Sequence, residues 1–369
     1  MCWHHNLIIT QTPEDYSTGV FIFANKFKQM RNIFFLFSAL LVILPAFFSC
    51  NSSDSRKSGD RSDSISQQLS ELNAAIEKDP KNSDLLTQRS EYYVRKELFN
   101  NALSDINKAI ELDPKNVKAY TGLSSIYLLL GKPQESLDAL NQVLKFDDRN
   151  ADIYLKKAKL YLIMKDYENC ATSVQRTIEI NPNLADAYYL KGMALMENDK
   201  MDLAIESFQR SVTINQSHFD ALMQLGYIWE KKDVKISIDY FKSATKANSK
   251  STEALYNLGL IYQDNQQPEK AILCYETINK LDPNNKLAFY NIGYVNLVYL
   301  NKYAKGVEYF TKAIGLDPNY IDAWYNRAYC YELLRDKEKA TSDYQQVLKL
   351  KVNDPKAIEG MNRLDKLMR

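Results

Sequence analysis

The sequence repeats itself about every 34 residues, and this period limits the folds open to the chain more than any other feature. A proline that follows Asp or Asn returns in five places, and three other residues fill its slot where it is missing: Pro80, Pro114, Asp148, Pro182, Gln216, Ser249, Pro283 and Pro318. A fixed period of about 20 to 50 residues indicates small units that stack on their neighbours. The sequence therefore predicts a solenoid, which grows by adding units and needs no central core.

Composition excludes several classes of function. The chain has 369 residues, 25% of them charged, with a net charge of +1. Such a balance argues against a nucleic-acid-binding protein, which would carry a basic stripe. The cysteines lie far apart and only one of the three histidines falls in the repeats: Cys2, Cys50, Cys170, Cys274, Cys330, His4, His5 and His218. We therefore expect no disulfide framework, no metal site and no cofactor.

The N-terminal part of the chain resembles an export signal. Residues 33–48 form an apolar run of 16 residues just after Arg31. A bilayer-spanning helix needs about 20 residues, so the run is better matched to the apolar region of a secretory signal. Because Met30 directly precedes Arg31, we expect translation to start there, with residues 1–29 an unstructured upstream extension and residues 30–50 the signal.

The end of this run, Phe47-Phe-Ser-Cys50, resembles the signal of bacterial lipoproteins. That resemblance implies cleavage before Cys50, a lipid on its sulfur and a place in the bacterial cell envelope, periplasmic or at the outer membrane. Phe47 and Phe48 depart from the usual pattern, so a single uncleaved N-terminal anchor remains an alternative. Residues 51–63 are polar and rich in serine, and we expect them to form a flexible tether.

We number positions within a repeat so that the proline slot is position 32 and the next repeat begins three residues later. Eight repeats then cover residues 83–350, beginning at Ser83, Val117, Ala151, Ala185, Phe219, Thr252, Lys286 and Ile321. Positions 8 and 20 are small throughout, as Gly259 and Ala271 illustrate, whereas positions 4 and 24 are large, as Leu255 and Tyr275 illustrate. Small columns let two helices approach closely, so each repeat is predicted to be a tight antiparallel helix pair.

These columns resemble the tetratricopeptide repeat, and Leu255-Tyr-Asn-Leu-Gly-Leu-Ile-Tyr262 with Ala271, Tyr275 and Pro283 follows the family pattern closely. The resemblance implies an all-α solenoid, a right-handed superhelix of antiparallel helix pairs. Two departures in length are expected to alter loops or pitch: one residue is missing between Val234 and Ser249, and one is inserted near Asn301 to Lys305.

Both ends of the array carry a predicted capping helix. Residues 64–80 have Leu69, Leu72, Ala75 and Ile76 at helical spacing and read as the second half of a truncated repeat. At the other end, Asp354 and Pro355 are typical of a helix start, and residues 354–369 place Ile358, Met361, Leu364 and Leu367 on one face. A solenoid needs such helices to cover its terminal core surfaces.

In the tetratricopeptide family, positions 2, 5, 9 and 12 of the first helices face a ligand held in a concave groove. Positions 5 and 9 turn aromatic or apolar from the fourth repeat on, which predicts a groove for a protein or peptide: Tyr189, Met193, Met223, Tyr227, Tyr256, Leu260, Tyr290, Tyr294, Tyr325 and Tyr329. Asn257, Asn291 and Asn326 at position 6 are candidates to bond a ligand's backbone. Plain packing between neighbouring repeats is the alternative for the residues at positions 5 and 9, whereas asparagine at position 6 is also common in the family without a ligand role.

No motif of a nucleotide-binding, zinc-dependent or serine-hydrolase enzyme is present. The Lys and Asn residues with which one group of the family grips chaperone tails are also missing from positions 5 and 9. We therefore expect a non-catalytic, membrane-tethered scaffold that binds another protein or peptide. The alternative is an accessory binding module of a cell-wall or carbohydrate-processing complex, because tyrosines also stack on sugars.

Overall fold

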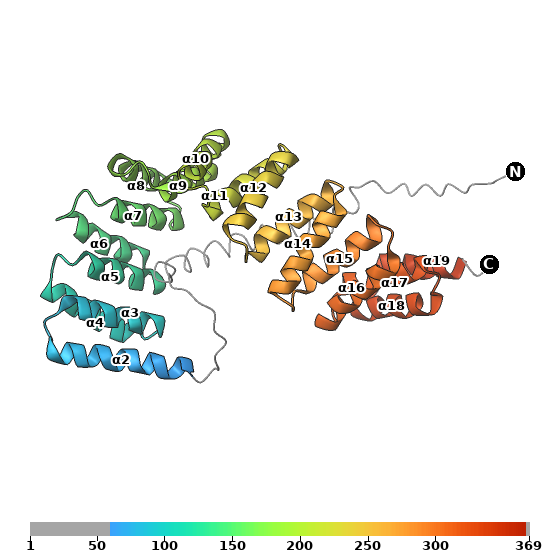
Figure 1. Ribbon diagram of the computed structural model, residues 1–369, viewed down its shortest axis with the longest axis horizontal. Coiled ribbons are helices and arrows are strands. Elements are labelled where there is room, and N and C mark those ends of the chain that lie inside the picture. The colour runs from blue at the N-terminus through green and yellow to red at the C-terminus, as the bar shows by residue number, and fades with distance from the viewer. Residues whose placement is uncertain (1–59, 367–369) are drawn as a thin grey trace. The chain divides into compact units, whose positions relative to one another are not determined.

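The computed structural model describes residues 60–366. They form 18 α-helices, α2 to α19, with no β-strand among the described residues (Figure 1), which confirms the predicted all-α class. Within this range, residues 60–182 and 183–366 make up two compact units, here called the N-terminal block and the C-terminal block.

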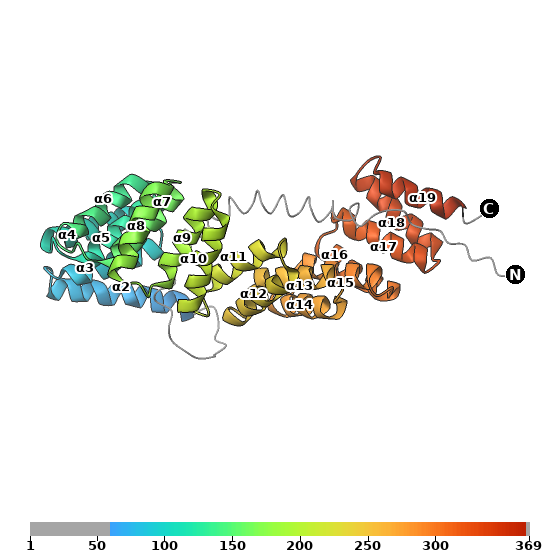
Figure 2. The same ribbon diagram turned by 90° about the horizontal axis from the view of Figure 1, so that it is seen from above.

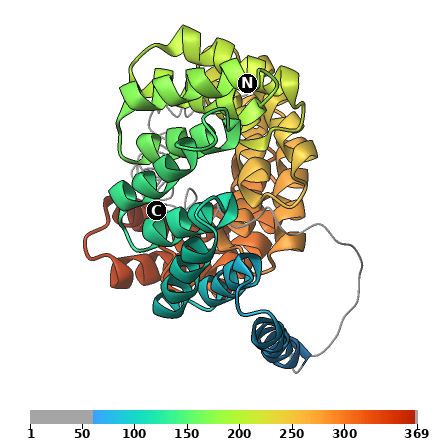
Figure 3. The ribbon, with the colours of Figure 1, turned by 90° about the vertical axis from the view of Figure 1, so that its left-hand side faces the viewer.

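The N-terminal block begins with α2 (Asp60–Lys78) and continues with three helix pairs. These are α3 (Ser83–Arg95) with α4 (Phe99–Leu112), α5 (Val117–Leu129) with α6 (Pro133–Leu144), and α7 (Ala151–Ile163) with α8 (Tyr167–Ile180). In Figure 3 this stack of helices runs up the view, from α2 in blue at the bottom to α8 in green toward the top.

The C-terminal block holds five helix pairs and a final single helix. The pairs are α9 (Ala185–Glu197) with α10 (Met201–Ile214), α11 (Phe219–Glu230) with α12 (Val234–Ala247), α13 (Thr252–Asp264) with α14 (Pro268–Leu281), α15 (Lys286–Val298) with α16 (Tyr303–Leu316), and α17 (Ile321–Leu333) with α18 (Lys337–Leu350). Helix α19 (Pro355–Lys366) follows (Figure 2). In both blocks the first helix of every pair begins at the residue that opens a sequence repeat.

The two helices of each pair meet where the sequence is small. A Cβ added to Gly192 would lie 2.6 Å from the ring of Phe208, and one on Gly259 would lie 2.7 Å from the ring of Tyr275. Position 8 is therefore small because the aromatic side chain at position 24 of the same repeat fills its space. In the second repeat, Ser124 and Ser136 touch directly through their hydroxyl groups at 2.7 Å, which brings positions 8 and 20 together.

An asparagine just before a first helix recurs as its N-cap. The Oδ1 atom of Asn116 accepts a hydrogen bond from the N–H of Ala119 at 2.9 Å, and its Nδ2 donates to Ser83 in the preceding repeat at 2.7 Å. One side chain thus satisfies an unpaired N–H at the helix start and joins two repeats. His218 takes this place before α11: its Nδ1 accepts from Ala221 N at 3.2 Å and its Nε2 bonds Asp186 at 3.1 Å.

The turns inside the pairs explain the two departures in length. Most of these turns contain one residue with positive φ, such as Gln266 at 53° or Gly131 at 70°. In the fifth repeat the missing residue falls before α12, because α11 has 12 residues where the other first helices have 13, whereas α12 keeps the full 14. The predicted location, between Val234 and Ser249, was therefore wrong. In the seventh repeat the extra residue lengthens the turn before α16, where Asn301 has a φ of 52°.

Helices cover both ends of the array, with small differences from the sequence analysis. Helix α2 begins at Asp60, four residues before the predicted start, and Ile76 packs on the core of the first repeat. At the other end, Asp354 caps α19 by accepting from the N–H of Ala357 at 3.1 Å. Leu364 is buried as predicted, but Ile358 is 41% exposed, because Ala357 and Gly360 lie against the preceding repeat instead.

None of the helices in the described range is both long and apolar enough to cross a membrane. The predicted signal, Cys50 and most of the predicted tether lie outside the described residues.

Candidate functional site

The first helices of the C-terminal block, α9, α11, α13, α15 and α17, form the surface on which the predicted site residues lie, and we call it the first-helix face. Within this block, α15 and α17 contact each other directly. Hydrogen bonds also join them: Asn326 Nδ2 on α17 donates to the hydroxyl oxygen of Tyr290 on α15 at 2.9 Å. In a stack of helix pairs, the side on which successive helices approach each other is the inner side.

The tyrosines predicted at positions 5 and 9 are all half-buried, and Leu260 is half-buried as well. Each position-5 tyrosine packs one face of its ring on the position-24 aromatic of its own repeat: Tyr189 on Phe208, Tyr256 on Tyr275, Tyr290 on Phe310 and Tyr325 on Tyr344, with ring centroids 5.6 to 6.0 Å apart. These rings are therefore held rigidly by the core, and only part of each is open to solvent.

The two predicted methionines differ from the tyrosines. Met193 is 5% exposed and Met223 is 4% exposed, so both side chains belong to the core rather than to the surface. Met193 at position 9 of the fourth repeat and Met223 at position 5 of the fifth are thus core residues. The expected thioether surface is not part of the first-helix face.

The position-6 asparagines are engaged with tyrosines of the preceding repeat. Asn326 bonds Tyr290 as described, and Asn257 Nδ2 donates to the hydroxyl oxygen of Tyr227 at 2.9 Å. The Tyr227 hydroxyl in turn donates to Glu253 Oε1 at 2.8 Å. These contacts correspond to the alternative of packing between repeats. Asn291 is only 8% exposed and lies beside Tyr256 of the preceding repeat, but its Nδ2 has no partner within ordinary hydrogen-bond geometry.

Burial raises the pKa of Tyr256, and raises that of Tyr290 well above the ordinary tyrosine value. The hydroxyl groups in this row are therefore protonated at neutral pH. They can exchange hydrogen bonds with amides and carboxylates, but they do not supply a charged nucleophile or base.

Carboxylates on the first-helix face escaped the sequence analysis. They occupy positions 2, 12 and 13 of the first helices: Asp186, Glu197, Asp220, Glu230, Glu253, Asp264, Asp322 and Glu332. Burial is the main cause that raises the pKa of Glu230, Asp264 and Asp322, although all three side chains reach solvent. Counting charges column by column would have revealed them, whereas the overall charge balance conceals them.

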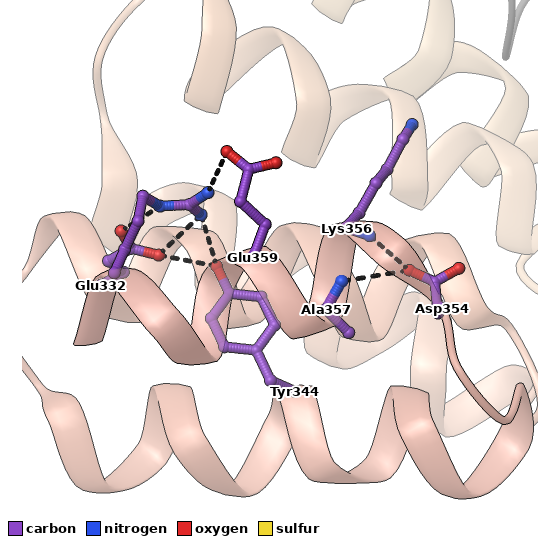
Figure 4. A network of polar contacts seen from close by, with 7 residues as sticks. Glu332, Tyr344, Asp354, Lys356, Ala357 and Glu359 are labelled. Atoms are coloured by element: carbon purple, nitrogen blue, oxygen red, sulfur yellow. Dashed lines mark hydrogen bonds and ion pairs between the residues drawn. The ribbon is translucent and has the colours of Figure 1, made fainter. Parts of the chain in front are cut away.

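The terminal helix α19 reaches this face. Arg363 on α19 forms two hydrogen bonds with Glu332 at the end of α17. Its Nε donates to Oε1 at 2.8 Å and its Nη2 donates to Oε2 at 3.0 Å (Figure 4). The Tyr344 hydroxyl also donates to Glu332 Oε2 at 2.7 Å. An arginine on a neighbouring helix therefore neutralises the carboxylate at position 12 of the last repeat.

The cysteines in the repeats are packing residues. Cys170, Cys274 and Cys330 are buried and unbridged, and burial raises the pKa of Cys170 and Cys330 to about 12 and that of Cys274 to about 11. Such thiols stay protonated and are poor nucleophiles. No group of three His, Cys, Asp or Glu side chains within the described range is arranged to hold a metal ion.

Comparisons with known proteins give the same repeats and fold. A crystal structure of the C-terminal part of a tetratricopeptide-repeat protein from Cytophaga hutchinsonii superposes with a TM-score of 0.56 at 21% identity, covering 64% of this chain and 98% of that one. An uncharacterized protein of Guillardia theta, ycf37, is 24% identical over 150 residues, which are 40% of this chain and 84% of that protein.

A third relative matches a short stretch. The DnaJ homolog subfamily C member 3 homolog of Dictyostelium discoideum is 32% identical over 84 residues, which are 23% of this chain. The chain spans only 17% of the length of that relative.

Sequence profiles described as the tetratricopeptide repeat match most of the array. They match residues 93–160, 151–184, 185–218, 252–285, 288–320 and 321–354, which together exceed half of the chain. With these matches and the all-α solenoid of helix pairs, the chain belongs to the tetratricopeptide repeat family.

Proposed function

We propose that this protein is a scaffold that binds an extended segment of another protein on the first-helix face of the C-terminal block, without catalysis of its own. The observation that carries the proposal is the row of half-buried tyrosines whose rings are fixed by the core. Rigid tyrosines offer contact area and a polar tip while losing little conformational entropy on binding. The membership in a family of protein-interaction repeats supports the same function.

Position 9 is the better column for testing this function, since position 5 also serves the core. One variant replaces three half-buried tyrosines of the first helices by alanine: Tyr227→Ala, Tyr294→Ala and Tyr329→Ala. A matched control makes the same change at three half-buried tyrosines of the second helices: Tyr240→Ala, Tyr303→Ala and Tyr309→Ala.

The experiment is affinity capture from membranes followed by mass spectrometry. We expect the first-helix variant to lose a protein that the unaltered chain and the control both retain. Circular dichroism verifies that both variants stay helical. Loss of the partner from the control alone, or loss of binding to a cell-wall polymer instead of a protein, would overturn the proposal, the latter in favour of a glycan-binding module.

We further propose that the chain is tethered in a bacterial cell envelope through a lipid on Cys50. The support is the order of a basic residue, an apolar run and a small residue just before Cys50. Metabolic labelling with a radioactive fatty acid tests this tether. Label is expected on the unaltered chain and not on Cys50→Ser, whereas an unlabelled chain would favour the uncleaved anchor.

A further inference from the structure

The first-helix face carries an excess of negative charge in the C-terminal block. At positions 2, 12 and 13 of its five first helices, eight carboxylates are accompanied by one lysine, Lys231. At the same positions the first helices of the N-terminal block carry both signs of charge, with Asp84 and Asp152 against Lys118 and Arg95.

Two of these carboxylates lie where they make no stabilising contact in the unbound protein. Glu230 and Asp264 are the last residues of α11 and α13, at the negative ends of the helix dipoles, where an anion is unfavourable. Neither forms an ion pair or a hydrogen bond with another described residue. The pKa of Glu230 is raised by burial and then by the charge of Asp264, so the two like charges act on each other.

The last repeat shows how a cation satisfies the same arrangement. Arg363 bonds Glu332 at position 12, and its guanidinium carbon lies 5.5 Å from the centre of the ring of Tyr329 at position 9. In the fifth repeat, Glu230 and Tyr227 occupy the same two positions. The residue that corresponds to Arg363 in the next helix is Leu260, so no arginine reaches Glu230 from there, and the neighbouring Lys231 lowers the pKa of Glu230 by less than burial and Asp264 raise it.

An independent feature in the same row calls for a backbone acceptor. The buried Nδ2 of Asn291 has no partner within ordinary hydrogen-bond geometry, although the equivalent Asn326 donates to Tyr290. Asn291 lies beside Tyr256, and a weak hydrogen bond from its side chain lowers the pKa of that tyrosine against the effect of burial, which places its amide in the tyrosine row. A buried donor that is not fully satisfied is unfavourable, because no hydrogen bond offsets the loss of its hydration. A carbonyl oxygen of a bound segment would satisfy it after a small shift of the side chain.

We propose that the first-helix face of the C-terminal block binds an extended segment of another protein that carries lysine or arginine side chains, with Glu230 and Asp264 as the main cation-binding pair. Asp322 adds a third carboxylate that makes no ion pair with another described residue. The cationic side chains lie beside Tyr227 as Arg363 lies beside Tyr329, and the segment's backbone bonds Asn291. This inference rests on the proposed function and specifies the chemistry of the partner.

The test uses the full chain, purified in a mild detergent, and a positional-scanning library of short peptides with blocked ends. The key variant is Glu230→Gln with Asp264→Asn. Its matched control is Glu206→Gln with Asp239→Asn, which removes the same two kinds of charge from exposed positions on the second helices α10 and α12. Asn291→Leu tests the backbone contact separately.

We expect the library to be enriched in Lys and Arg at two or more positions. The key variant should weaken the enriched peptides by about tenfold at low ionic strength, and less at high salt, because screening reduces partly exposed charge pairs. The control should bind as the unaltered chain does. Asn291→Leu should weaken the binding of peptides with and without basic residues alike, since it removes a hydrogen bond to the peptide backbone.

Three results would overturn the inference: no preference for basic residues, equal losses in the control, or self-association that the key variant abolishes, which would make a second copy the occupant. If the tyrosine variant still loses its captured partner while the library shows no basic preference, the proposed function stands and only this inference fails. If the captured partner also survives the tyrosine variant, both fail.

Discussion

The ring of Tyr275 occupies the space beside Gly259, so that a Cβ added to the glycine would lie 2.7 Å from the ring. Gly315 on α16, in contrast, has no atom within 4 Å of the place where its Cβ would stand. Gly259 is therefore needed for the close approach of two helices, whereas Gly315 is only tolerated in its helix.

Alanine at these two glycines should shift stability in opposite directions. Gly259→Ala should destabilise the chain by about 1 to 3 kcal/mol through overpacking. Gly315→Ala should stabilise it by up to about 1 kcal/mol through helix propensity. Urea unfolding followed by circular dichroism measures both. A neutral Gly259→Ala would mean that α13 and α14 are not held as closely as described.

Replacing either Arg327 or Asp343 alone should destabilise the chain more than replacing both residues of this ion pair together. Arg327 bonds Asp343 through Nε at 2.7 Å and Nη2 at 2.9 Å, and Asp343 is almost fully buried. Arg327→Leu or Asp343→Tyr alone should cost about 3 kcal/mol, since each leaves a buried charge unpaired.

The double change should cost less than either single one, because the fifth repeat carries Leu225 and Tyr240 at the same two positions. The thermal midpoints of the three variants and the unaltered chain complete the cycle. A double variant as unstable as the sum of the single ones would show no coupling between the two side chains, which would contradict this account.

Removing the charges of Glu230 and Asp264 should make the unbound protein more stable at pH 7. Because burial raises both pKa values in the folded state, the folded protein binds more protons than the unfolded chain between the ordinary and the raised pKa, and its stability falls as the pH rises through this interval. The gain in thermal midpoint for Glu230→Gln with Asp264→Asn should therefore be present at pH 7.

This gain should disappear below about pH 4, where the carboxyl groups are protonated in both states. Thermal melts across pH 3.5 to 7.5 give the comparison. A variant less stable than the parent at pH 7 would indicate that the two carboxylates have partners within the chain, and the argument for a bound cation would lose its basis.

His218 should be replaceable by asparagine and not by alanine. Its Nδ1 caps α11, and its Nε2 bonds Asp186 in the preceding repeat. Asn116 makes both kinds of contact in the second repeat. His218→Ala should lose about 1 kcal/mol, whereas His218→Asn should lose much less. Equal losses in urea unfolding would argue that the ring's packing against Tyr189, and not its hydrogen bonds, secures this junction.

The fold could be predicted because the repeat enforces the same contacts many times. Position 8 reads Gly192, Gly226, Gly259 and Gly293 in consecutive repeats, and in each case an aromatic ring at position 24 stands where a side chain would be. One ambiguous pair would have carried little weight, but a small column opposite a large one leaves a close helix pair as the natural packing.

The candidate site was harder to predict from the sequence, because the positions of its side chains depend on how one repeat lies against the next. The sequence does not reveal that Met193 and Met223 turn into the core or that Asn326 reaches back to Tyr290. Those outcomes depend on small offsets between neighbouring first helices. The carboxylates Glu230 and Asp264 were visible in the sequence, but only their position at helix ends without cationic partners gives them meaning.

The most direct measurement is hydroxyl-radical footprinting of the full chain with and without its captured partner. Binding on the first-helix face predicts that Tyr227, Tyr294 and Tyr329 become protected in the complex, while the oxidation of Tyr240, Tyr303 and Tyr309 on the second helices stays unchanged. Protection of the second-helix tyrosines with no change at the first three would place the partner on the opposite face and contradict the proposal.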